Sequence, residues 1–175
     1  PGFISNIGAT AVYDSVTIKL RLDGYSYGLE GQSEERFTIH EITEDSLSFY
    51  RRYYYNTILG YDPTPLGEAS YTVNTTNLGG AAEDTLLFEA KLDDAFGLKL
   101  FNRALVDTDS TFSRTDFSYA VKGLAFIPSQ SNMIIGLNTN SISQVTLHYH
   151  TADADSLERP YRIGTQFPTL RTWLD

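Results

Sequence analysis

The sequence predicts an all-β fold, a β-sandwich that is jelly-roll-like and carries one short helix. Short segments with strand-like patterns follow one another, separated by glycine, proline and asparagine turn signals, which is typical of sandwiches and jelly rolls. One segment has the spacing of a helix. The chain contains 12 Tyr and 10 Phe but 1 Trp, and these aromatic residues favour the pleated surface of strands. Because there is no internal repeat or linker, residues 1–175 are predicted to form one domain.

The first strand is the clearest element. Residues 12–23 alternate strictly, which predicts one buried face and one solvated face. The apolar positions are Val16, Ile18, Leu20 and Leu22. The polar positions are Thr17, Lys19, Arg21 and Asp23. Glycines then predict a loop over residues 24–32, and a second strand is expected over residues 36–43.

The rest of the chain shows weaker patterns. Residues 44–56 fit either a short helix or an irregular edge, and two prolines predict a turn over residues 61–67. Further strands are expected over residues 70–74, 85–93, 117–128, 132–138 and 144–151. Residues 158–175 have no clear period, so no element is predicted there.

The single helix is predicted after the fourth strand and ends at Leu105. Asp93 or Asp94 can cap it, since a short acidic side chain accepts hydrogen bonds from the free amides of a first turn. Leu98, Phe101 and Leu105 are spaced to share its buried face. Gly97 lowers the expected stability of this helix by about 1 kcal/mol relative to alanine.

The charge of the chain argues against nucleic acid as a partner. The net charge is −9, whereas a nucleic-acid-binding surface normally carries a basic field. Arg51 and Arg52 would have to act as a very local patch against that field.

The chain has no cysteine, which excludes disulfides, thiolate chemistry and cysteine-based zinc sites. It also shows no apolar run of membrane-spanning length and no signal peptide. It begins with Pro1 rather than methionine. We therefore expect a mature product or a fragment, with any export signal or lipid anchor upstream.

Two histidines are the strongest candidates for a metal site. His148 and His150 are two apart on a predicted strand, so they share a face and could chelate a metal as in a cupin barrel. Such a site still needs a third ligand and supporting contacts. The simpler interpretation is a solvent-facing pair.

Acidic loops raise a second metal hypothesis. They occur at residues 92–94, at residues 107–110 with Asp107 and Asp109, and at residues 152–156. Calcium prefers clustered oxygen ligands on loops, and two loops meeting at one end of a sandwich could hold one structural ion. None of them matches a complete calcium loop, so solvated turns and a helix cap explain them equally.

No pattern indicates catalysis. An activated serine with a positioned histidine is not signalled, because the G-x-S-x-G elbow is missing. The glycine pair in residues 77–85 lacks the lysine and the strand–helix context of a phosphate loop. The chain is therefore predicted not to be an enzyme and to need no cofactor.

Aromatic and basic residues gather in residues 48–67. The candidate binding residues are Tyr50, Arg51, Arg52, Tyr53 and Tyr54, with Tyr27 in the glycine-rich loop. Packing on the flank of a sandwich is the plainest interpretation, because tyrosine buries a ring and keeps a hydroxyl in water. Sugar stacking and a protein interface are the functional alternatives.

The order of several short motifs resembles a family of Bacteroidota surface lipoproteins known as a domain of unknown function. The motifs are found at residues 14–16, 41–44, 54–56, 65–67 and 122–124. Tyr55 stands where the family often has serine. More remotely, the chain is similar to jelly-roll modules of adhesins and carbohydrate-binding proteins. Repeated Asp-Ser and Asp-Thr pairs also resemble the O-glycosylation signal of exported Bacteroidota proteins.

The resemblance implies an exported protein that is lipid-anchored at the outer membrane or cell surface. The predicted function is a non-catalytic module that acts as a subunit or accessory of a larger surface protein assembly. Outer-membrane or surface proteins are then the expected partners, held by strand edges and the tyrosine segment. A carbohydrate-binding module that stacks sugars on exposed tyrosines is the alternative, and a cupin-like metal enzyme is the remote one.

Overall fold

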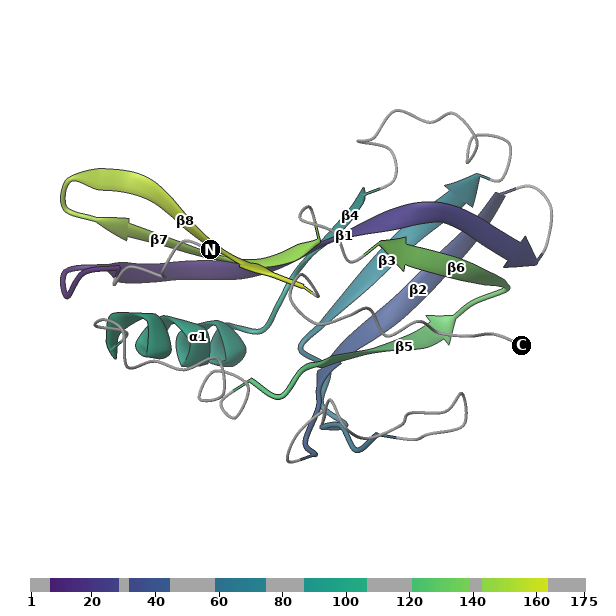
Figure 1. Ribbon diagram of the computed structural model, residues 1–175, viewed down its shortest axis with the longest axis horizontal. Coiled ribbons are helices and arrows are strands. Elements are labelled where there is room, and N and C mark those ends of the chain that lie inside the picture. The colour runs from purple at the N-terminus through teal and green to yellow at the C-terminus, as the bar shows by residue number, and fades with distance from the viewer. Residues whose placement is uncertain are drawn as a thin grey trace.

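Two antiparallel β-sheets and one helix make up the described part of the chain (Figure 1). The computed structural model describes residues 7–28, 32–44, 59–74, 87–106, 121–138 and 143–163. The elements are β1 (Val12–Gly28), β2 (Gln32–Glu41), β3 (Gly67–Asn74), β4 (Leu87–Lys91), α1 (Asp94–Val106), β5 (Leu124–Gln130), β6 (Met133–Asn138), β7 (Gln144–Thr151) and β8 (Ala154–Arg162). The five-stranded sheet has the order β4-β1-β7-β8, with β6 also paired to β1, and the three-stranded sheet has the order β3-β2-β5.

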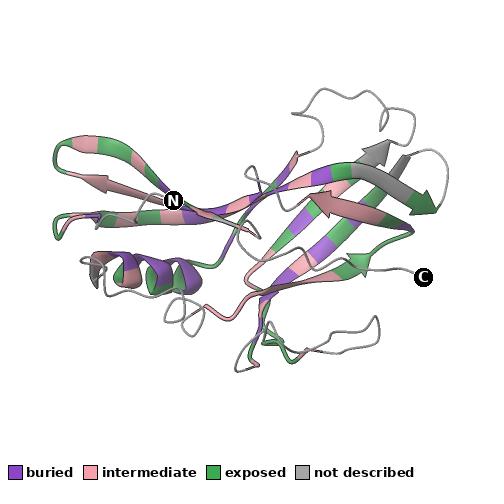
Figure 2. Ribbon diagram, in the orientation of Figure 1, coloured by how far each residue is buried: buried purple, intermediate pink, exposed green. Residues whose placement is uncertain are grey.

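The predicted all-β sandwich is confirmed. Apolar side chains from both sheets form one buried cluster, in which Leu20 and Leu22 of β1 meet Ile39 of β2. The rings of Phe37 and Phe88 stack across the two sheets with centroids 5.9 Å apart. Buried positions alternate with intermediate or exposed ones along β1 from Val16 to Asp23 and along β2 from Glu34 to Ile39 (Figure 2), as expected for strands with one solvated face. The jelly-roll strand order remains a prediction.

β1 spans two differently covered halves of the molecule. Its C-terminal half pairs with β6 and faces the three-stranded sheet; we call this region the sandwich half. Its N-terminal half pairs with β7, which pairs with β8, and α1 contacts β1 and β7 on their apolar face (Figure 1). We call this region the helix-covered half. Its smaller buried cluster is Ile7, Phe101, Ala104 and Leu147.

β6 and β7 lie end to end along the same partner strand. Asn138 of β6 is opposite Arg21, and Gln144 of β7 is opposite Lys19. The fully buried Ser143 lies at this interruption. Its hydroxyl accepts from the amide of Arg21 at 3.0 Å and donates to the carbonyl of Asn138. The side chain therefore replaces the ladder contacts that a continuous strand would make.

α1 begins as predicted, but one residue of its buried face was wrongly assigned. Asp93 is the cap, because its carboxylate accepts from the amide of Ala95 at 2.8 Å. Leu98 is 43% exposed and does not share the buried face with Phe101. The buried apolar positions are Phe96, Leu100, Phe101 and Ala104. They form the stripe of the helix that faces the strands.

A hydrogen bond and a ring contact of Tyr13 join β1 to α1. The Tyr13 hydroxyl donates to Asp94 at 3.0 Å, and its ring meets Phe101 edge-on with centroids 5.9 Å apart. Burial, reinforced by the Asp94 contact, raises the pKa of Tyr13 above its ordinary value. The same hydrogen bond, together with Lys91 at 3.3 Å, lowers the pKa of Asp94. Gly97 makes this approach possible, since a Cβ there would lie 2.0 Å from the Tyr13 hydroxyl oxygen.

Several predicted element boundaries differ from the structure. β2 covers Gln32–Glu41 instead of residues 36–43, and β3 begins at Gly67 instead of residue 70. β8 lies largely where the sequence showed no period, because Arg159 takes an inward, buried position and Pro160 argues against a strand. β1 continues to Gly28, so the predicted loop over residues 24–32 is shorter. β5 continues past Pro128, and its described part begins only at Leu124. Residues 45–58, with the alternative of a short helix or irregular edge, lie outside the described residues.

Candidate functional site

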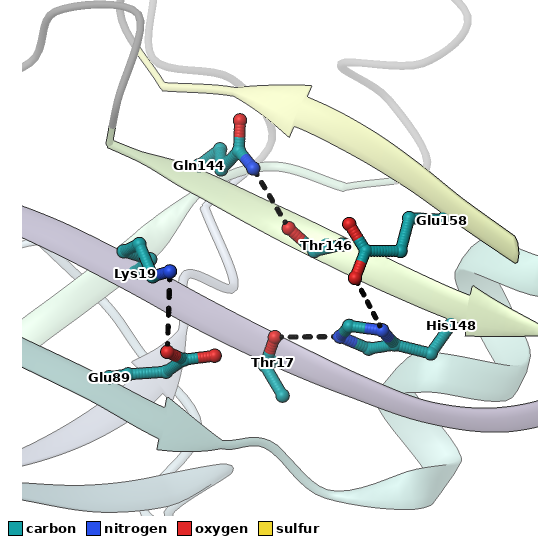
Figure 3. Close-up of polar contacts among 7 residues, drawn as sticks. All are labelled: Thr17, Lys19, Glu89, Gln144, Thr146, His148 and Glu158. Carbon is teal, nitrogen blue, oxygen red and sulfur yellow. Dashed lines mark hydrogen bonds and ion pairs between the residues drawn. The ribbon is translucent and has the colours of Figure 1, made fainter. Parts of the chain in front are cut away.

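Polar side chains of β1, β4, β7 and β8 lie together on the outer face of the five-stranded sheet (Figure 3). Because β1 alternates, its polar positions Thr17, Lys19, Arg21 and Asp23 point away from the core. Lys19 of β1 pairs with Glu89 of β4 at 3.4 Å, and Gln144 donates to the hydroxyl of Thr146 within β7 at 3.2 Å. These contacts place hydroxyl, amide and charged groups side by side over β4, β1, β7 and β8.

Thr17, His148 and Glu158 form a row across three strands of this face (Figure 3). The Thr17 hydroxyl oxygen lies 2.9 Å from Nε2 of His148. Nδ1 of the same ring lies 3.5 Å from Oε1 of Glu158. A carboxylate only accepts hydrogen bonds, so the proton of the neutral ring belongs on Nδ1. Nε2 is then the acceptor for the Thr17 hydroxyl.

His150 has a different partner from His148. The register between β1 and β7 shifts at Asp14, and this places the Asp14 carboxylate 2.7 Å from Nδ1 of His150. The two histidine side chains share the outer face, as predicted, and are 27% and 41% exposed. Each is engaged by its own carboxylate rather than aimed at a common point.

Among the described residues, no group of three or more His, Asp or Glu side chains is arranged to hold a metal ion. The predicted candidates Asp107 and Asp109 lie outside these residues. His40, the remaining histidine of the chain, belongs to the three-stranded sheet and is not near the other two in sheet order.

His40 forms a second threonine–histidine pair, but in a closed setting. Its Nε2 lies 2.8 Å from the Thr38 hydroxyl, and its Nδ1 lies 2.7 Å from the carbonyl oxygen of Asp62. Tyr61 covers the ring at 5.0 Å between centroids, and His40 is only 6% exposed. This pair holds the segment before β3 against β2.

Tyr27 is the one predicted binding residue within the described part of the chain. It is 69% exposed and lies directly opposite Ile134, which is 50% exposed. Beside this pair the register of β1 shifts between Leu22 and Ser26. Beside this shift, the carboxylate of Asp23 lies against Gly136. A Cβ added at Gly136 would be 2.1 Å from Oδ1 of Asp23.

The other predicted binding residues, Tyr50, Arg51, Arg52, Tyr53 and Tyr54, lie outside the described residues. Sequence reasoning placed Thr17 on the polar face but did not connect it to His148. The two residues are far apart in the chain, and no local pattern shows which strands become neighbours. The i, i+2 histidine spacing was the one signal that pointed to this face.

In comparisons with known proteins, no family model matches this chain, and no curated protein or solved structure shows a significant match. The described helix is also too short and too polar to cross a membrane. The resemblance to Bacteroidota surface lipoproteins therefore remains a prediction from the order of its motifs.

Proposed function

We propose that this chain is a non-catalytic cell-surface or outer-membrane-associated module, acting as a subunit or accessory of a larger surface protein assembly. The observation that carries the proposal is the exposed Tyr27–Ile134 pair on β1 and β6. Large aromatic side chains on open surfaces are favoured anchors of protein interfaces. An isoleucine directly across the strand adds apolar area to the same spot.

The outer face is a better docking surface than the edges formed by β4, β5 and β8. β5 and β8 each have a single partner strand within the described residues and contain Pro128 and Pro160. A proline provides no N–H for an added strand. β4, the outer strand beside β1, has only 5 residues. A partner that lies on the face meets none of these obstacles.

A carbohydrate ligand is the second candidate, favoured by the polar groups beside Tyr27. Arg21 and Asn138 lie opposite each other, and the Asp23 carboxylate lies between them and the tyrosine along the same face. A tyrosine ring can cover the C–H side of a sugar, while charged and amide groups bond its hydroxyls. The cupin-like alternative lacks a third ligand among the described side chains.

The test is affinity capture of tagged full-length protein from its native membranes in mild detergent, read by mass spectrometry. The chain should carry a stoichiometric outer-membrane protein. The double variant Tyr27→Ala/Ile134→Ala should lose that protein by at least about tenfold, since interface hot spots typically contribute about 2 kcal/mol or more. Leu98→Ala, an exposed leucine on α1, is the matched control and should retain it.

Two results contradict the assembly proposal. One is a chain that arrives alone from its membranes. The other is a partner that is retained equally by the double variant, which would move the interface away from Tyr27. A glycan panel with and without calcium, read by tyrosine fluorescence, then tests the carbohydrate alternative on the same variants.

A further inference from the structure

The row Thr17–His148–Glu158 has the arrangement of an activated hydroxyl. The 2.9 Å contact between the Thr17 oxygen and Nε2 of His148 is within the range of a nucleophile and its general base. Glu158 lies behind the ring, with Oε1 3.5 Å from the opposite nitrogen, Nδ1, where the carboxylate can orient the imidazole. All three side chains come from different strands, so the sheet fixes their order.

The row is also open to solvent. Thr17 is partly exposed, and the side chains of His148 and Glu158 are 27% and 62% exposed. The buried Thr38–His40 pair shows the contrast within the same molecule. The distance from the Thr38 hydroxyl oxygen to Nε2 of His40 is similar, at 2.8 Å. The other ring nitrogen, however, faces a backbone carbonyl oxygen instead of a carboxylate, and His40 is 6% exposed.

We propose that Thr17 is a nucleophilic acyl-accepting site that reacts with activated acyl esters, with His148 as its base. The site goes beyond the proposed binding function and is separate from Tyr27, which lies at the other end of β1. The reaction is a modification of the chain rather than a turnover cycle. It needs only the hydroxyl, its base and an ester with a good leaving group.

In the reaction, the Thr17 oxygen attacks the acyl carbon of the ester while its proton passes to Nε2 of His148. The bond from the acyl carbon to the leaving oxygen then breaks. In an aryl ester, that oxygen departs with the electron pair as a phenolate. The products are an acylated Thr17 and an imidazolium facing Glu158. The imidazolium then returns its proton to water. Base assistance of this kind typically accelerates a reaction by about 10²–10⁴-fold.

The two lysines nearest to Thr17 in the ladder and along β1 are held in ion pairs. Lys91 lies opposite Thr17 on β4 but is paired with Asp94 at 3.3 Å. Lys19, two residues along β1, is paired with Glu89. Ser15 is directly across from His148 in the ladder, so it is the competing hydroxyl that peptide mapping has to separate from Thr17.

The experiment uses the purified full chain and p-nitrophenyl acetate, with the acetylated positions mapped by mass spectrometry over time. Hydroxylamine separates the sites, because it cleaves an ester on threonine and leaves an amide on lysine intact. We expect a hydroxylamine-sensitive acetyl group on Thr17 that forms on the order of 10²-fold faster than on Thr38. Thr17→Ser should keep the reaction, and Thr17→Val should abolish it.

Variants of the base and of a neighbour complete the test. His148→Gln should reduce the labelling of Thr17 to the rate of Thr38, and Glu158→Gln should slow it by a smaller factor. Lys19→Gln, on the same face but outside the row, should leave the rate unchanged. The inference is overturned if Thr17 is unlabelled while lysines react, if His148→Gln is labelled as fast as the wild type, or if the ester lies on Ser15. Circular dichroism confirms that each variant is folded.

Discussion

The two halves of β1 are held by different kinds of contact. In the sandwich half, aliphatic side chains of two sheets form the core, and residues such as Leu22 and Ile39 are 2% and 0% exposed. In the helix-covered half, the buried cluster is small and is rimmed by Tyr13, Tyr149 and Tyr161. The first region depends on summed apolar burial, which many residues share. The second depends on a few contacts, each of which has a specific geometry.

This difference also separates the proposed sites. Tyr27 and Ile134 lie in the sandwich half. Thr17, His148 and Glu158 lie where β1, β7 and β8 pair, which is the helix-covered half. A change that loosens α1 should therefore disturb the histidine row more than the Tyr27 surface.

Truncating the centre of the sandwich half should have the largest effect. Ile39→Ala removes a side chain that is 0% exposed, and such a change typically lowers the free energy of unfolding by about 2–5 kcal/mol through lost burial and a residual cavity. Urea denaturation measures it. Leu98→Ala, at an exposed position of α1, should change stability by no more than about 0.5 kcal/mol. Equal effects of the two variants would contradict the assignment of the core.

Adding one methyl group should loosen the helix-covered half. In Gly97→Ala the new Cβ would lie 2.0 Å from the hydroxyl oxygen and 2.6 Å from Cζ of Tyr13. Overpacking of this kind costs about 1–3 kcal/mol, which opposes the gain of about 1 kcal/mol in helix propensity. We expect a net loss of stability in thermal unfolding.

The Gly97→Ala change should also be measured in a Tyr13→Ala background. In the Tyr13→Ala background the clash is gone, so the same Gly97→Ala change should become stabilising. A reversal of sign between the two backgrounds is the result that the structure requires. A stabilising effect in the wild-type background would show that the ring does not cross the helix at Gly97.

Ser143→Ala tests the junction between the two halves. The change removes the acceptor for the Arg21 amide and the donor to the Asn138 carbonyl. Leaving buried backbone groups without partners costs about 1–3 kcal/mol. Hydrogen exchange should accelerate at the Arg21 amide and little at the amides of β2. Exchange that rises equally in both strands would indicate global unfolding rather than a local role.

The sequence predicted those parts of the fold that depend on local pattern. Alternation in β1 identified its buried and polar faces, and the acidic pair at the start of α1 limited its cap to Asp93 or Asp94, of which the structure uses Asp93. β8 was missed because Arg159 and Pro160 break the pattern of a strand. The site could not be predicted as a unit, because the contact of Thr17 with His148 depends on the pairing of β1 with β7. Which strands pair depends on contacts between segments that are far apart in the chain, and no local pattern records them.

The smallest expected effect is a dependence of stability on pH in the helix-covered half. The Tyr13 hydrogen bond and Lys91 lower the pKa of Asp94 in the folded chain. The unfolded chain therefore takes up this proton more readily than the folded one. The stabilisation is present above the ordinary aspartate value of about 3.9 and is lost as the pH falls through the lower folded pKa. Asp94→Asn should thus melt at a lower temperature than the wild type at neutral pH, and the two should converge in acid.

Tyr13→Phe separates this contribution from helix capping in general. Without the hydroxyl donor, the carboxylate of Asp94 keeps only its contact with Lys91, so its pKa should rise toward the ordinary value. The coupling between Tyr13→Phe and Asp94→Asn in a double-mutant cycle should be measurable at neutral pH and vanish in acid. The absence of coupling at neutral pH would mean that the ring packing against Phe101, which Tyr13→Phe keeps, rather than the hydrogen bond to Asp94, joins β1 to the helix.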